Sequence, residues 1–436
     1  MRNLTHDILS KATKMADTAE VFMVQSESMP VVFEANNLKS LQSKESRSIS
    51  LRIFRNGRIG FASSNNTDDI DWLVQAAVET SQFGAPANYA LPPQNNFPAV
   101  ECYDPQVEQI SLNHMVSLGN EMIAALLAHT PELVCDASVS RHKQSINIIN
   151  SEGLDATYSS SAFSLGVEGT LINGSDMLFV GESDNSCRPI TDTSKILDTV
   201  RMQLERAKTL TCVRSGTMPV IFTPDGVASA IVAPLMAAFN GKLVFEGASP
   251  LGDKLGQKVF DSKLELNDDA TIPYCIGSSP FDDEGVPSQR LPLIKDGIPL
   301  NFIYDLKTAA QANKISTGHG RRGGGLPLPS PRAFVFNNGN VAPTDMIAEI
   351  KEGLLIEQVM GATQGNILGG DFSGNVLLGY KIENGCIAGR VKDTMVFGNV
   401  YELLRDIAAT GNDGHWLGGQ VFAPSFYFPA FSVSSK

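Results

Sequence analysis

Histidine and cysteine, the residues that most often carry metal or nucleophilic chemistry, are spread thinly over this sequence. The six histidines stand at positions 6, 114, 129, 142, 319 and 415, and the closest pair, His129 and His142, is thirteen residues apart. A helical zinc site needs two ligands three or four residues apart on one face. The six cysteines are equally scattered and form no CxxC pair. The spacing predicts no local metal site and leaves open only a site assembled from distant residues.

Nucleophile and phosphate motifs are also missing. Ser249 in GASPLG lacks the second glycine of a GxSxG elbow. The longer segment GASPLGDKLG lacks the Gly-Lys-Ser/Thr that ends a P-loop, so we interpret it as an ordinary loop. No cysteine lies beside a histidine in a way that predicts activation.

Two clusters of charge remain. FDDEGVPSQR contains Asp282, Asp283 and Glu284, and GHGRRGGGLP contains Arg321 and Arg322. Adjacent carboxylates before a glycine, and arginines among glycines, are typical of solvated turns, which is what the local pattern favours. The alternatives are that the carboxylates bind a cation and that the arginines bind a carboxylate or a peptide C-terminus bidentately.

Helices and strands alternate in the first half of the chain. The N-terminal residues predict a surface helix, and residues 20–63 predict strands with a tight hairpin at Asn56-Gly57. A helix follows, with Thr67 as its N-cap and Gly84 as its stop. A proline-rich connector spans 85–107.

The same order then repeats. A helix over 111–129 begins at the cap Ser111, strands follow with a turn at residues 151–153, and a helix spans 192–208. The repetition indicates a weak internal duplication, and strands that come as hairpins favour antiparallel α+β.

The composition and the pattern of predicted elements change after residue 212. A helix is predicted near 226–239, and the rest is glycine-rich and strand-like, with turns at Glu284-Gly285, Asp296-Gly297 and Asn384-Gly385. We therefore predict an N-terminal α+β domain over 1–212, with sub-segments of about 19–84 and 108–208, and a β-rich C-terminal domain over 213–436.

Composition narrows the class of protein. The chain has 436 residues, 42% of them hydrophobic and 19% charged, as in a globular protein with a sizeable core. The net charge of −13 disfavours nucleic-acid binding. No apolar run is long enough for a signal peptide or a transmembrane helix. Scattered cysteines suit a reducing compartment, so we expect a cytoplasmic protein without membrane contact.

Several motifs together resemble the TldD/PmbA family. FDDEGVPSQRLPLIKDGIPLNFIYDLKTA followed by TGHGRR is similar to that family's DDEGxPxQR and TGxGRR segments. Further similarity lies in LGQKV at 255–259, in GDFSGNVLLGYKIENGCIAGRVKDTMVFGNVYELL at 370–404, in INSEGL at 149–154, and in AEVFMVQSE with SLRIFRNGRIGFASS. The resemblance covers the chain from about residue 19 to its end.

The resemblance implies a fold and a place for catalytic residues. The family's TldD member carries an HExxxH helix, whose histidines hold zinc and whose glutamate activates water, and a late Gly-x-Cys loop. Its TldE (PmbA) member has the same fold without these ligands. Counting back from LGQ, the motif positions fall on Ala230, Ile231 and Leu235, and GNDGHWLGGQVFAPSF contains no cysteine. The chain thus resembles the TldE type, and these positions are expected to pack as a core helix.

The resemblance also implies partners. We expect a non-catalytic subunit that pairs with a zinc-bearing TldD-like chain to trim extended peptides, with no cofactor of its own and with homodimers as a further possibility. Candidate substrate- or partner-binding residues in the matched motifs are Asp283, Glu284, Arg290, Arg321 and Arg322. Two alternatives stay open: an interaction protein of the gyrase-modulator type, and an independent hydrolase with an unrecognised site.

Overall fold

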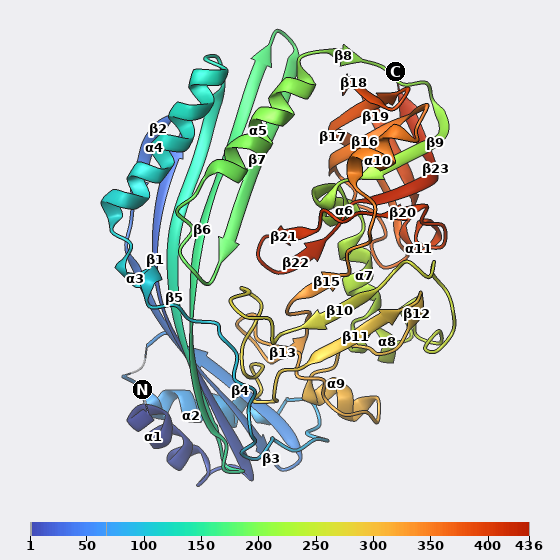
Figure 1. Ribbon diagram of the computed structural model, residues 1–436. Coiled ribbons are helices and arrows are strands. Elements are labelled where there is room, and N and C mark those ends of the chain that lie inside the picture. The colour runs from blue at the N-terminus through green and yellow to red at the C-terminus, as the bar shows by residue number, and fades with distance from the viewer. Residues whose placement is uncertain (1, 67, 436) are drawn as a thin grey trace.

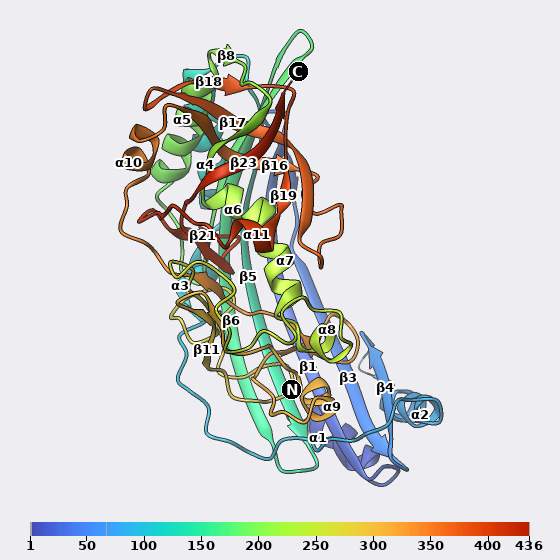
Figure 2. The same cartoon turned by 90° about the vertical axis from the view of Figure 1, so that its right-hand side faces the viewer.

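The computed structural model describes residues 2–66 and 68–435. Within them the chain is an α+β fold, as the sequence predicts: a long antiparallel sheet built from the N-terminal half lies beside a β-rich C-terminal half (Figure 1). Figure 2 shows that the long strands run nearly the whole length of the molecule.

The long sheet has the order β4-β3-β1-β5-β6-β7, with β2 beside β1. Its strands are β1 (Thr18–Glu34), β2 (Asn37–Leu41), β3 (Lys44–Arg55), β4 (Arg58–Ser64), β5 (Val134–Asn150), β6 (Asp155–Asn173) and β7 (Asp176–Ser186). The predicted hairpin at Asn56-Gly57 is confirmed, since both residues have positive φ, 49° and 72°, and Arg55 pairs with Arg58. The strands of both predicted repeats, β1–β4 from the first and β5–β7 from the second, thus form one sheet.

Strand β1 continues through Pro30, where a strand would often break. Its pairing with β3 ends at Ser28 and its pairing with β2 begins at Val31, while Pro30 stays in register with Ser140 of β5. On the side of β2 and β3 the Pro30 carbonyl accepts from the Gln42 N–H at 3.3 Å, and the missing N–H falls between the two ladders, where proline is tolerated in a sheet.

Helices flank this sheet. They are α1 (Arg2–Ala12), α2 (Ile70–Ser81), α3 (Gln106–Gln109), α4 (Leu112–His129) and α5 (Ser194–Ala207). The predicted cap Ser111 is confirmed, because its hydroxyl accepts from the His114 N–H at 3.2 Å. The predicted cap Thr67 lies outside the described residues, and the Asp69 carboxylate caps α2 by accepting from the Trp72 N–H at 2.9 Å. Helix α2 ends at Ser81, three residues before the predicted stop Gly84.

The C-terminal half contains a closed barrel, because β16 pairs with both β9 and β17 and thereby closes the order β16-β9-β23-β19-β17. The barrel sheet contains β8 (Leu210–Thr211), β9 (Gly216–Phe222), β16 (Glu352–Met360), β17 (Asp371–Glu383), β18 (Cys386–Val391), β19 (Thr394–Asn399), β20 (Ala409–Thr410) and β23 (Phe426–Ser435). A smaller sheet contains β10 (Leu266–Asp269), β11 (Arg290–Lys295), β12 (Ile298–Pro299), β15 (Phe334–Phe336), β21 (His415–Leu417) and β22 (Val421–Ala423). Strands β13 (Gly320–Arg321) and β14 (Leu328–Pro329) pair separately.

The helices of this half are short. They are α6 (Pro224–Ala230), α7 (Val232–Ala238), α8 (Gly241–Phe245), α9 (Leu306–Gln311), α10 (Pro343–Ala348) and α11 (Val400–Leu403). The sequence predicts only one helix here, and the others escape because one or two turns leave no periodic pattern. The pair α6–α7 runs from the barrel to the smaller sheet (Figures 1 and 2).

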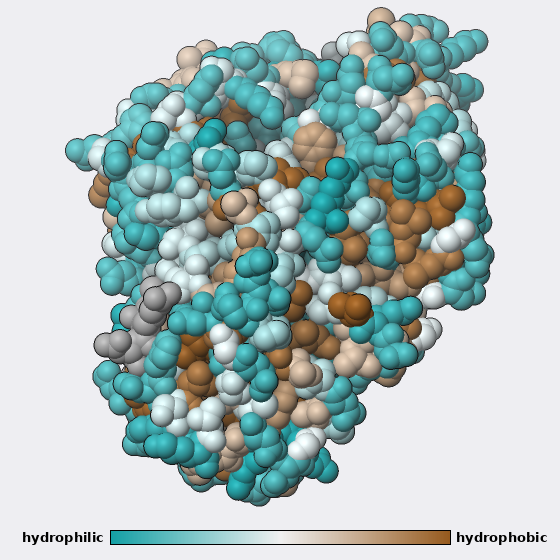
Figure 3. Space-filling view, turned by 60° about the horizontal axis from the view of Figure 1, so that its bottom comes forward, coloured by the Kyte–Doolittle hydropathy of each residue, from teal (hydrophilic) through white to brown (hydrophobic). Residues whose placement is uncertain are grey.

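The two halves share hydrophobic core. One cluster of buried side chains combines residues of the long sheet, α4 and α5 with Ile221, Leu355 and Tyr380 of the barrel. Among the described residues no helix has the length and apolarity to span a membrane. Figure 3 shows a mostly hydrophilic face that carries several separate hydrophobic patches.

Candidate functional site

The segment that would hold a zinc motif is two short helices rather than one. Helix α6 begins where the Thr223 hydroxyl accepts from the Gly226 N–H at 3.4 Å. The helix is interrupted at Ile231, which ends α6 and precedes α7. Pro234 follows in α7, and because proline has no N–H it cannot bond to the carbonyl four residues earlier, at Ala230. The predicted helix near 226–239 is thus present but broken.

Its inward side is apolar and closed to solvent. Ala230, Ile231 and Leu235 are 1%, 0% and 0% exposed. They belong to the core cluster that also contains Phe222 of the barrel and Phe334 of the smaller sheet. None of the three side chains can bind a metal ion or move a proton. The expected packed face is confirmed.

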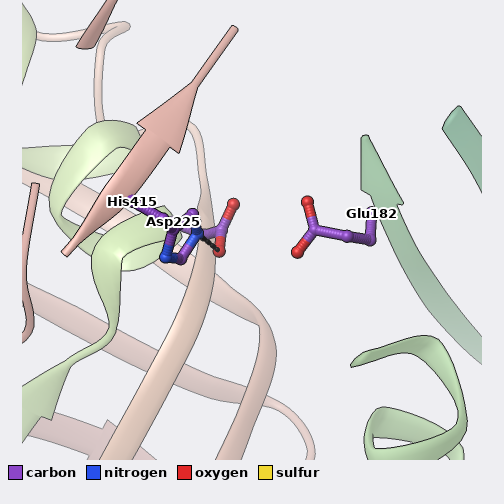
Figure 4. Close-up of side chains that lie close together, drawn as sticks. All are labelled: Glu182, Asp225 and His415. Atoms are coloured by element: carbon purple, nitrogen blue, oxygen red, sulfur yellow. Dashed lines mark ion pairs between the residues drawn. The ribbon is translucent and has the colours of Figure 1, made fainter. Parts of the chain in front are cut away.

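Next to this helix, three potential metal ligands from distant parts of the chain come together. Asp225 at the start of α6, His415 on β21 and Glu182 on β7 point toward one another (Figure 4). Their ligand atoms lie within 4.8 Å of one another. Burial raises the pKa of Glu182, and the Asp225 carboxylate raises it further. Burial also raises the pKa of Asp225, partly offset by His415.

The spacing of this triad does not match a tetrahedral zinc site. His415 Nε2 and Asp225 Oδ2 are 3.9 Å apart. Two ligands on one tetrahedral Zn²⁺, each about 2.1 Å from the ion, lie about 3.4 Å apart. We therefore assign no metal to the triad, although it is the one place among residues 2–66 and 68–435 where three such ligands gather.

The two charged sequence motifs meet each other. Gly320 N–H donates to Asp282 Oδ2 at 2.7 Å, and Arg322 N–H donates to Asp283 Oδ2 at 2.8 Å. The Asp282 Oδ1 atom also accepts from the N–H groups of Glu284 and Val286, both at 2.9 Å. Backbone donors thus replace water around these carboxylates.

Arginine side chains join the motifs to the long sheet. Arg52 on β3 donates to both carboxylate oxygens of Glu20 on β1, at 3.1 and 2.7 Å, and to Glu284 Oε1 at 2.7 Å. Arg322 also pairs with Glu20. We call Glu20, Arg52, Asp282, Asp283, Glu284 and Arg322 the charged joint.

The expectation of solvated turns is wrong for most of the charged joint. Asp282 and Glu284 are 1% and 0% exposed, and the Arg322 side chain is 5% exposed. Burial raises the pKa of Asp282 to about 8 and also raises the pKa of Glu284, which Arg52 partly offsets. Burial opposes the charge of Arg52, but Glu20, Tyr89 and Glu284 outweigh it and keep its pKa above the usual arginine value.

Family models match the chain in three segments. The PmbA/TldA metallopeptidase C-terminal domain matches residues 215–435, its domain 1 matches residues 19–81, and its central domain matches residues 105–188. The chain belongs to the TldD/PmbA family.

Relatives within the TldD/PmbA family match along nearly the whole chain. An uncharacterized protein of Methanocaldococcus jannaschii is 26% identical over 94% of this chain and 94% of its own length. A metalloprotease PmbA homolog of Haemophilus influenzae is 25% identical over 92% of this chain and 89% of its own.

Solved structures of this fold superpose closely. TldE from Thermococcus kodakarensis has a TM-score of 0.92 at 21% identity, covering 99% of this chain and all of that one. A Thermotoga maritima protein, named for a proposed modulation of DNA gyrase, has a TM-score of 0.89 at 20% identity, with coverage of 99% and 100%. At these identities the likeness shows the TldD/PmbA fold.

Of the candidate binding residues expected from the TldD/PmbA motifs, four lie together and one lies apart. Asp283 accepts from the Arg322 N–H, and Glu284 lies against Gly320. Arg290 is on β11, where its Nε lies 3.9 Å from Asp269 Oδ2. Glu284 has internal partners for both oxygens, Arg52 Nη1 and the Leu306 N–H, each at 2.7 Å. A binding role for the five residues stays a prediction.

Sequence reasoning missed the residues that distant strands contribute to these sites. Glu20 and Arg52 are directly opposite each other in the β1–β3 register. An acidic residue in one predicted strand and a basic residue in a nearby predicted strand could have indicated this ion pair. The gathering of Glu182, Asp225 and His415 leaves no signal, because more than forty residues separate each from the next.

Proposed function

We propose that this chain is the non-catalytic subunit of a TldD/TldE-type zinc metallopeptidase that trims extended peptides in the cytoplasm. One observation carries the proposal: at the positions of HExxxH this chain has Ala230, Ile231 and Leu235, each at most 1% exposed. A zinc-binding and water-activating site needs imidazole and carboxylate groups there. The peptidase chemistry is therefore assigned to a TldD-like partner chain.

A partner chain needs a surface on which to pack. The hydrophobic patches of Figure 3 support such a contact, since exposed apolar patches mark protein interfaces. The same surfaces could join two copies of this chain. Light scattering on the isolated chain, and on its mixture with the TldD-like chain, separates a homodimer from a heteromeric complex.

Elemental analysis of the purified chain tests the assignment of zinc to the partner. We expect no stoichiometric zinc. About one zinc per chain in the parent would contradict the proposal at once. The variants Asp225→Asn and His415→Gln, measured in parallel, would then show whether that zinc sits at the triad of Glu182, Asp225 and His415.

The alternatives predict other outcomes. An independent hydrolase would cleave peptides without a partner and without metal. An interaction protein of the gyrase-modulator type would gain no peptidase activity on addition of any HExxxH-bearing chain. A neighbouring gene that encodes such a chain would favour the subunit.

A further inference from the structure

The buried guanidinium of Arg332 lacks a counter-charge. The residue is 5% exposed, and its Nε and Nη1 atoms are buried without a hydrogen-bond partner, while Nη2 donates to Ser279 Oγ. The Asp268 carboxylate accepts instead from the backbone N–H of Arg332, at 2.9 Å, and of Ala333, at 3.3 Å. Leaving charged donors buried and unpaired is costly, and such groups in folded proteins mark a missing ligand, ion or water.

A pocket of about 370 Å³ lies against this guanidinium. Arg321 and Ser278 also line it, and Ser278 Oγ is another buried atom without a partner among the described residues. The pocket size falls within the usual range for small-ligand sites. Several unused donors thus converge on one cavity.

The charges around this pocket favour an anion. Among residues 2–66 and 68–435, no carboxylate lies within 4.0 Å of the guanidinium of Arg321 or Arg332. Burial, and then the charge of Arg332, lowers the pKa of Arg321, and Asp283, Tyr158 and Asp268 offset this only in part. Arg322, which also lines the pocket, is neutralised by Glu20. Asp283, a carboxylate in the lining, accepts through Oδ2 from the Arg322 N–H.

Backbone packing holds Arg332 in this place. A Cβ atom on Gly277 would come within 1.9 Å of the Arg332 carbonyl oxygen, so the two segments can lie this close only with glycine there. The wall of the pocket is therefore built before any ligand arrives.

The opposite wall of the pocket is the long sheet. His142 and Gln144 of β5 and Ser160 of β6 line it, and Gln144 pairs with Ser160. Side chains at every second residue share one face of a strand. On that face, Ser138 lines a cleft of about 590 Å³ that also includes Asp225 of α6. Four residues of strand, about 13 Å, separate His142 from Ser138.

We propose that Arg332, Arg321 and Ser278 bind a carboxylate of an extended peptide, whose backbone runs along β5 toward the cleft beside α6. This rests on the proposed function, which supplies the peptide. The carboxylate is either the peptide C-terminus or an acidic side chain. Guanidinium groups bind carboxylates through charge-assisted, bidentate hydrogen bonds. Arg322 is excluded from this role because its charge is used inside the charged joint.

Calorimetric titration of the isolated chain tests the proposal without any cleavage step. Three ten-residue peptides of glycine, serine and alanine are compared: one with a free C-terminal carboxylate, its C-terminal amide, and the amide with one central glutamate. We expect at least one of the two carboxylate-bearing peptides to bind about tenfold tighter than the plain amide. Which one does so identifies the source of the carboxylate.

Variants locate the site. Arg332→Gln and Arg321→Gln should each abolish the preference for the carboxylate, whereas Arg214→Gln, which removes an arginine of the same half whose side chain is 86% exposed, should leave it intact. Arg321 is only half-buried, so its variant remains informative if Arg332→Gln unfolds. Equal binding of all three peptides, binding of inorganic phosphate alone, or a preference that survives in Arg321→Gln would overturn the proposal. A complex that binds these peptides but never cleaves them would instead overturn the proposed function.

Discussion

The helix pair α6–α7 and the charged joint are both buried, but they are built from opposite kinds of side chain. At the motif positions of α6–α7 the chain has Ala230, Ile231 and Leu235 in a hydrophobic cluster. The charged joint places Arg52, 1% exposed, between Glu20 and Glu284, both 0% exposed. Buried charge is tolerated only where partners and hydrogen bonds are complete. The first region therefore presents no side chain that can bind a metal ion or move a proton at the motif positions, whereas the second joins the long sheet to the C-terminal half through ion pairs.

The largest effect is expected from making the apolar region polar. In the variant Ala230→His, Ile231→Glu, Leu235→His, each new polar group left unpaired costs on the order of 1–3 kcal/mol. The late cysteine of the family's zinc site is still missing, so we expect an unstable protein without peptidase activity. Urea unfolding, zinc content and peptide cleavage are measured beside Ile231→Val, which should cost about 0.5–1.5 kcal/mol. A stable triple variant that cleaved peptide with zinc would mean that this helix face opens on a chamber.

Removing the central arginine of the charged joint should lower the free energy of unfolding by somewhat less than the triple variant does. Arg52→Met leaves Glu20 and Glu284 without their shared counter-charge, and breaking a buried ion pair in this way costs about 3–5 kcal/mol. The matched control is Arg214→Met, since Arg214 pairs with Glu352 at 2.6 Å but its side chain is 86% exposed. We expect no measurable change for the control in urea unfolding. Equal stability of the two variants would show that the joint is not held by charge.

Glu357 is a buried carboxylate outside the charged joint, and its titration should make the stability of the protein depend on pH. Glu357 is 6% exposed, with Gln203 Nε2 at 3.0 Å and Arg206 Nη1 at 3.3 Å. Burial raises its pKa from 4.5 to about 7, partly offset by Arg206. Because the folded-state pKa is the higher one, the stabilisation is complete below the unfolded value and is lost as pH rises through 4.5 to about 7.

Glu357→Gln should remove this loss of stability with pH, which amounts to roughly 3 kcal/mol. Urea unfolding at several pH values between 4 and 8 measures it in the variant and the parent. The variant should gain stability relative to the parent as pH rises. A difference that stays constant with pH would show that folding does not raise the pKa of Glu357.

Local patterns predicted the parts of the fold that local forces determine. The hairpin at Asn56-Gly57 follows from two residues that tolerate positive φ, and α4 begins where the Ser111 hydroxyl can cap it. Long-range pairing could not be predicted in this way. Nothing near Glu20 indicates that β5 is its other neighbour, and nothing near Asp282 indicates that Gly320 donates to it. Burial of a charge depends on partners far away in the sequence, so the carboxylates of the FDDEG motif looked solvated.

The same limit applies to the candidate sites. The apolar nature of the α6–α7 segment could be predicted, because it needs only the residue types at positions 230, 231 and 235. The unpaired guanidinium N–H groups of Arg332 could not be predicted, because they are unpaired only since the Asp268 carboxylate accepts from backbone N–H groups instead.

Cleavage by separated and combined subunits tests the central claim most directly. An unfolded peptide is incubated with this chain alone, with an HExxxH-bearing TldD-like chain alone, and with both, each in the presence and absence of a zinc chelator. We expect no turnover by this chain alone and chelator-sensitive turnover by the mixture, above that of the partner alone. Turnover by the isolated chain that survives the chelator and further purification would contradict this claim.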